Sequence, residues 1–118
     1  LKTIELGYIV NVFAEGFCEN RLEYFLELPK GKVVVKFSDT NMAKAKEVLG
    51  NHCCIIGNVP STLLQMGSPS EVDEYCKKLI KVCGKGGGYI MTSDTNAIQE
   101  AKPENVKVMV DSVKKYQP

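Results

Sequence analysis

The feature that most constrains this chain is a fourfold alternation of short apolar stretches with segments of helical periodicity. Each apolar stretch is of strand length, and apolar residues at helical spacing follow it. A repeated β-α order with short connections is typical of parallel strands joined by right-handed crossovers. We therefore expect an α/β fold built from four consecutive β-α units.

The expected strands cover residues 8–13, 33–37, 53–56 and 89–92. A helix over 21–28 stops at Pro29, and a long helix begins at Ser68-Pro69-Ser70-Glu71, where Ser68 and Glu71 form a capping box. Asp39 or Thr40 is expected to cap the second helix, which Gly50 closes. Pro103 opens the last helix. The inward faces are expected to be Leu22, Phe25 and Leu26; Met42, Ala45, Val48 and Leu49; Val72, Tyr75, Cys76, Leu79, Ile80 and Cys83; and Val106, Met109, Val110 and Val113.

Composition excludes several classes of protein. The chain has 118 residues, 44% hydrophobic and 25% charged, with a formal net charge of +1. Because lysine and glutamate are mixed along the chain, we expect no nucleic-acid partner. The apolar runs are too short for a membrane helix, so we expect no membrane partner either. Five cysteines, an odd number, favour reduced thiols and a cytoplasmic location. We expect one domain over residues 1–118 and, because the chain opens on Leu1, a piece of a longer protein.

Polar residues follow the end of every expected strand, in the loops 14–20, 38–41, 57–62 and 93–96. The carboxyl ends of parallel strands meet at one rim, where such folds carry their ligand sites. We therefore expect Glu15, Asp39, Asn58 and Asp94 to bind substrate at this rim. Asn58 is the first choice, because its amide both donates and accepts; the alternative is that it only hydrogen-bonds its own turn. Asn96 belongs to the fourth loop.

The run His52-Cys53-Cys54 invites a metal or redox interpretation. Successive strand residues point to opposite faces, so the two cysteines cannot both bind one metal ion, and we interpret them as small buried side chains. The glycine-rich run 84–88 precedes a strand instead of opening a helix, which favours a turn over a phosphate loop. We expect no tightly bound metal.

Longer stretches carry a resemblance to a known family. GNVPSTLLQMGSPSEVDEYCKKLIKVCGKGGGYIM and AKPENVKVMVDSVKKY, with FAEGFCENRLEYFLELPKGK and FSDTNMAKAKEVLG upstream, resemble the C-terminal part of the uroporphyrinogen decarboxylase superfamily, which also contains corrinoid-dependent methyltransferases. The resemblance implies the C-terminal half, strands five to eight, of a (β/α)8 TIM-type barrel. It also implies that the Gly57-Asn58-Val59-Pro60 turn leaves the seventh strand at the catalytic mouth.

The resemblance also implies two kinds of site. The methyltransferases carry a His-x-Cys pair and a further Cys that bind zinc, and these positions fall near Val35, Phe37 and Asp94, none of which is a soft ligand. The decarboxylase branch places a histidine in the eighth loop, where this chain has Ser93-Asp94-Thr95-Asn96. We expect no metal and no cofactor, while the catalytic residues stay unassigned.

Two functions remain open. In the first, the chain belongs to an enzyme that decarboxylates a tetrapyrrole or transfers a methyl group from a small methylated substrate. The partners that the resemblance implies are a small-molecule substrate and a corrinoid protein. The isolated chain would then be inactive. In the second, it is a non-catalytic, self-standing half-barrel that binds or assembles. Because half a barrel leaves its edge strands unpaired, we also expect a homo-oligomer.

Overall fold

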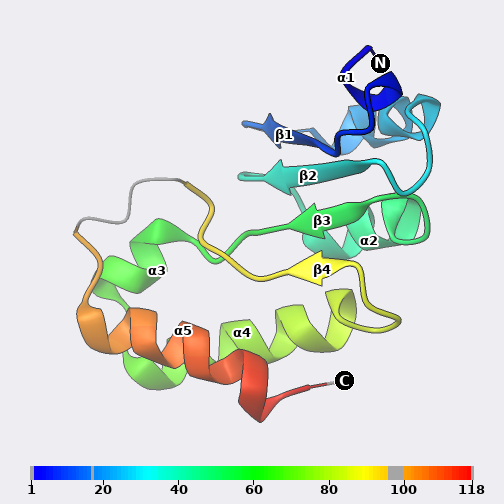
Figure 1. Cartoon of the computed structure of the whole chain (residues 1–118). Helices are drawn as coiled ribbons and strands as arrows, with labels where there is room; N and C mark the ends of the chain where they lie inside the picture. Colours follow the sequence, from blue (N-terminus) through cyan, green and yellow to red (C-terminus); the bar gives the residue numbers. More distant parts are fainter. Residues whose placement is uncertain (1, 17, 96–99, 118) are drawn as a thin grey trace.

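Four parallel strands form one sheet in the order β1-β2-β3-β4 (Figure 1). The computed structural model describes residues 2–16, 18–95 and 100–117. The strands are β1 (Val10–Ala14), β2 (Val33–Phe37), β3 (Cys54–Ile56) and β4 (Tyr89–Ile90), and every neighbouring pair is parallel. The expected α/β fold with four parallel strands is confirmed.

The two faces of the sheet differ. On β2 burial alternates, so that Val33, Val35 and Phe37 are buried toward the helices whereas Val34 and Lys36 are half-buried on the other face. The strand register places residues of β1, β3 and β4 on the same side of the sheet as Val34 and Lys36. We call this side the open face. The open face consists of Asn11, Phe13, Val34, Lys36, Cys54, Ile56 and Ile90.

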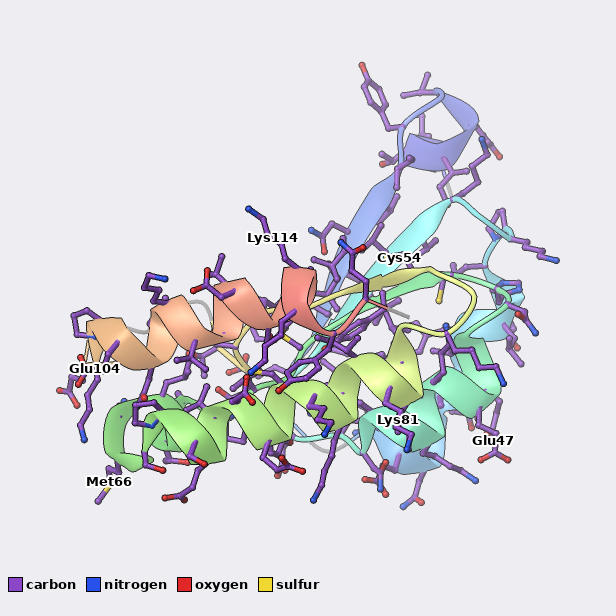
Figure 2. The ribbon with its side chains drawn as sticks, turned by 90° about the horizontal axis from the view of Figure 1, so that it is seen from below. Glu47, Cys54, Met66, Lys81, Glu104 and Lys114 are labelled. Atoms are coloured by element: carbon purple, nitrogen blue, oxygen red, sulfur yellow. The ribbon has the colours of Figure 1, made fainter. Side chains whose placement is uncertain are left out.

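Helices pack on the buried face of the sheet. They are the 3-10 helix η1 (Glu19–Glu27), α2 (Met42–Leu49), α3 (Ser61–Met66), α4 (Pro69–Cys83) and α5 (Pro103–Lys115). The short helix α1 (Lys2–Glu5) buries no residue and lies beyond β1, at the top of Figure 1. In Figure 1, η1 and α2 lie behind the sheet, with α4 and α5 below it. Seen from below in Figure 2, α4 and α5 run side by side, and Met66 at the end of α3 points away from the protein.

Several boundaries differ from those expected. The segment after β1 is a 3-10 helix and not an α-helix, and the N-cap of α2 is Asn41, whose Oδ1 accepts hydrogen bonds from the amides of Ala43 and Lys44. Asp39 and Thr40 are therefore not the cap: Asn41 directly precedes the first helical residue and can reach the amides of the first turn. The short helix α3 was not expected, because its six residues are too few to show helical periodicity.

The buried face of α5 also differs from the expected one. Asn105, Met109 and Ser112 are buried, whereas Val110 and Val113 are 57% and 45% exposed. The Asn105 Nδ2 group donates to the carbonyl oxygens of Leu64 and Gly67, at 3.0 and 2.9 Å, and thereby fixes the rotation of α5 against α3. The hydrogen bonds of Asn105, and not the helical spacing of the valines, thus determine which side of α5 faces inward.

The core lies between the sheet and its helices, and it includes several of the thiols. Cys53, Cys76 and Cys83 are buried among Phe37, Leu49, Ile55, Leu64 and Val72. Burial raises the pKa of the Cys83 thiol from 9.0 to about 11, and its Sγ lies 3.6 Å from the Met42 carbonyl oxygen.

In the described part of the chain, none of the helices has the length and apolar character needed to cross a membrane.

Candidate ligand site at the carboxyl edge

The loops that leave the strands meet at one edge of the sheet, the left-hand edge in Figure 1, which we call the carboxyl edge. Four hydrogen bonds join the first two loops. The amides of Gly16 and Cys18 donate to Ser38 Oγ and Thr40 Oγ1, at 2.7 and 3.2 Å. In the third, the Asn41 amide donates to Glu19 Oε1 at 2.8 Å, and in the fourth, Thr40 Oγ1 donates to the Gly16 carbonyl oxygen at 3.4 Å. These bonds hold the loops after β1 and β2 in a fixed relation.

Asn58 joins the third loop to the second. Its side chain is 7% exposed, and Nδ2 donates to the carbonyl oxygens of Ser38 and Thr40, each at 2.7 Å. The amide therefore bonds the neighbouring loop and not its own turn. Asn58 also lines a cavity of about 310 Å³ between α2 and α4, together with Tyr75 and Lys78.

Asp94 joins the fourth loop to the third. Its amide donates to the Val59 carbonyl oxygen at 2.9 Å, and its Oδ1 accepts from the Ser61 amide at 3.0 Å, at the first residue of α3. A carboxylate at this end of a helix satisfies an amide that lacks a helical partner. Burial, and after it the charge of Asp94, raises the pKa of Tyr75 on α4. The Asp94 carboxylate therefore lies at the first residue of α3.

The other two expected residues lie outside this network of side chains. Glu15 is exposed and lines a cavity of about 280 Å³ beside η1, together with Arg21 and Tyr24. Asp39 is exposed. The structure thus places the four predicted residues at one edge without gathering their side chains into one cluster. Asn96 lies outside the described residues.

Lys36 is a residue of this edge that the sequence reasoning missed. It lies on the open face, one residue before the end of β2. Its Nζ donates to the Thr95 carbonyl oxygen at 3.3 Å and lies 5.3 Å from the centre of the Phe13 ring. The available signal was the single charge that interrupts the apolar run 33–37.

The zinc-ligand positions inferred from the resemblance need a correction. Val35 and Phe37 are fully buried on the helix-facing side of β2, so neither side chain faces the open side of the sheet. Alternation along the strand places Lys36 there instead. Within residues 2–16, 18–95 and 100–117, no three His, Cys, Asp or Glu side chains are grouped so that they could hold a metal ion.

His52 and the two adjacent cysteines lie at the opposite edge of the sheet. His52 Nε2 lies 2.5 Å from the Leu28 carbonyl oxygen, which ties the start of β3 to the end of η1. Burial raises the pKa of Cys53 and of Cys54, with the Lys46 charge opposing it at Cys54. The three residues line a shallow cavity of about 450 Å³ beside Gly88, with Cys54 visible near the glycine-rich turn in Figure 2. Cys53 is buried in the core as expected, whereas Cys54 is half-buried on the open face, so the interpretation as a small buried side chain fits Cys53 only.

Comparisons with known proteins agree with this architecture. The family model described as uroporphyrinogen decarboxylase (URO-D) matches residues 2–116. The uroporphyrinogen decarboxylase of Chlorobium phaeovibrioides (strain DSM 265 / 1930) is 29% identical over 77 residues, which are 63% of this chain and 22% of that protein. That of Pseudoalteromonas atlantica (strain T6c / ATCC BAA-1087) is 30% identical over 78 residues, 66% of this chain and 21% of that protein.

A solved structure shows the same fold. A methyltransferase from Methanosarcina mazei superposes with a TM-score of 0.60 at 16% identity, over 96% of this chain and 44% of that one. At that identity the likeness concerns the fold alone. The chain spans about a fifth of the length of the curated relatives that it matches. Because the family model matches nearly the whole chain, the chain belongs to the uroporphyrinogen decarboxylase family.

Proposed function

We propose that this chain forms the C-terminal half of the barrel of an enzyme that acts on a small molecule, and that its carboxyl edge supplies part of the mouth. The observation that supports this is the hydrogen bonding between the four loops. Ser38 and Thr40 join the second loop to the first, Asn58 joins the third to the second, and Asp94 joins the fourth to the third. Such bonding holds loop atoms in place at the edge where parallel barrels bind their substrates.

Two reactions fit this family. The curated relatives are named as uroporphyrinogen decarboxylases, which favours decarboxylation of a tetrapyrrole. The structural neighbour is a methyltransferase, and methyl transfer from a small methylated substrate, with a corrinoid protein as partner, is the second candidate. In either case we expect the isolated chain to be inactive, because the remaining half of the mouth would come from chain outside it.

The test uses the complete product of the reading frame that encodes this chain. Decarboxylation of uroporphyrinogen and methyl transfer to a corrinoid protein are measured side by side, with residues 1–118 alone as the control. We expect one of the two activities in the complete protein and neither in residues 1–118. A complete protein that folds and shows neither activity, or a reading frame that begins close to Leu1, would favour the non-catalytic half-barrel instead.

A further inference from the structure

We propose that the cavity of about 310 Å³ between α2 and α4 binds a small uncharged aromatic molecule, such as a phenol, that donates a hydrogen bond to Asn58 Oδ1. The cavity lies among the helices that cover the sheet, on the side opposite the open face. The inference therefore goes beyond the proposed function and holds for either of its two reactions.

The floor of the cavity is apolar and buried. It is formed by Met42 at the start of α2 and by Leu79 and Cys83 on α4, which are 4%, 8% and 0% exposed. Thioether and thiol groups, which two of these side chains carry, make favourable contacts with aromatic rings. The volume lies at the lower end of the range of cavities that bind small molecules. The floor therefore favours a small ligand with an aromatic ring.

Asn58 supplies the directional contact. Its Nδ2 donates to the carbonyl oxygens of Ser38 and Thr40, whereas within the described residues no hydrogen bond reaches its Oδ1. The other polar side chain of the floor is already used, because Thr40 Oγ1 accepts from the Cys18 amide and donates to the Gly16 carbonyl oxygen. An acceptor on a largely buried side chain is satisfied by a donor that enters the cavity. We therefore expect a hydroxyl or N–H group at the inner end of the ligand.

The lining of the cavity favours an uncharged ligand. Lys78 is the one charged side chain among the described residues that line it, and it is exposed at the rim, where water screens its charge. Burial raises the pKa of Tyr75, which is half-buried beside Lys78, so its hydroxyl group stays uncharged at neutral pH. A charged ligand would lose its hydration at the floor without gaining a charged partner there.

The experiment follows binding at two buried methionines. The complete product of the reading frame is labelled with ¹³C at its methionine methyl groups and titrated with phenol. Met42 reports on the floor of the cavity. Met109 is the matched control, because it is 7% exposed and lines a different cavity, of about 280 Å³, on α5.

Three further probes separate the features of the ligand. Anisole keeps the ring but has no hydrogen to donate, cyclohexanol keeps the hydroxyl group but has no aromatic ring, and benzoate adds a negative charge. Two variants locate the site. Val82→Trp places a bulky side chain at the rim, and Val110→Trp is the same substitution at an exposed position of α5.

We expect phenol to move the Met42 signal with a Kd of roughly 1 mM and to leave the Met109 signal in place. Anisole should bind about 3- to 10-fold more weakly, because it cannot donate to Asn58. Cyclohexanol should also bind about 3- to 10-fold more weakly, and benzoate at least about 10-fold. Val82→Trp should weaken phenol binding at least about 10-fold, whereas Val110→Trp should leave it unchanged.

Other results would overturn the inference. An unmoved Met42 signal, or a Met109 signal that moves in its place, contradicts the site. Anisole that binds as tightly as phenol contradicts the hydrogen bond to Asn58, and equal binding of cyclohexanol or benzoate contradicts the aromatic or the uncharged class. Phenol binding that a folded Val82→Trp variant retains in full shows that the ligand lies elsewhere. The four probes need no variant, and none of these results bears on the proposed function, because no activity is measured.

Discussion

At the scale of single residues, Asn58 shows how one buried amide can hold two loops together. Both of its Nδ2 hydrogens are used, on the carbonyl oxygens of Ser38 and Thr40. Replacing it with alanine leaves these two acceptors without their partner in a largely buried place. We expect Asn58→Ala to lower the free energy of unfolding by about 2–4 kcal/mol, measured by urea denaturation.

Two further variants test this assignment. Asn58→Asp keeps the size of the side chain but cannot donate when ionised, so it should be at least as destabilising as alanine. Asn51→Ala is the matched control, because Asn51 is exposed in the turn before β3, and it should cost less than about 0.5 kcal/mol. Equal stability of Asn58→Ala and Asn51→Ala would show that the two bonds do not stabilise the fold.

At the scale of elements, α4 is the helix whose first turn is most clearly predicted by the sequence, because Ser68, Pro69 and Glu71 form a capping box there. Ser68 accepts from the Glu71 amide at 3.2 Å, the Glu71 carboxylate accepts from the Ser68 amide, and Pro69 occupies the first position. We expect Ser68→Ala to cost about 1 kcal/mol of unfolding free energy, measured by thermal or urea denaturation. Ser70→Ala, an exposed serine within the first turn, is the control and should leave stability within about 0.5 kcal/mol. A loss for Ser68→Ala no larger than for Ser70→Ala would contradict the capping box.

At the scale of the whole molecule, the buried thiols predict how stability depends on alkaline pH. Burial raises the pKa of Cys83 to about 11 and also raises the pKa of Cys53 and Cys76. Above pH 9 the unfolded chain loses these protons while the folded chain keeps them, so stability is full below pH 9 and falls toward pH 11. Each thiol contributes up to about 1.4 kcal/mol per pH unit within its window.

The measurement is urea denaturation at pH 7, 9, 10 and 11. Cys83→Ala serves as the comparison, because it removes one titrating thiol. It should be less stable than the unaltered chain at pH 7, yet its stability should fall less steeply between pH 9 and 11. A slope that the substitution leaves unchanged would mean that Cys83 does not titrate differently in the two states.

The edges of the sheet make self-association of residues 1–118 a prediction at the same scale. In the described residues, the outer edges of β1 and β4 have no strand beside them, and Ile90 on β4 is 50% exposed. Unpaired edges with apolar side chains favour pairing with another chain. We expect a homodimer or larger oligomer by sedimentation, weakened by Ile90→Lys. Val82→Lys on α4, where the valine is 44% exposed, should leave the association unchanged. A monomer at high concentration with normal stability would contradict the prediction.

The sequence by itself determined the order of the β-α units, the parallel sheet, the capping box of α4 and the family, because these depend on local periodicity and on residues close together in the chain. Only the tertiary structure decided which polar side chains serve the fold and which face the open side of the sheet. Asn58, Asp94 and Asn105 bond to atoms 18 to 41 residues away, so no local pattern could show those partners. The direction in which Lys36 points follows from the register of β2 against β1 and β3, since a shift by one residue would turn it toward the helices.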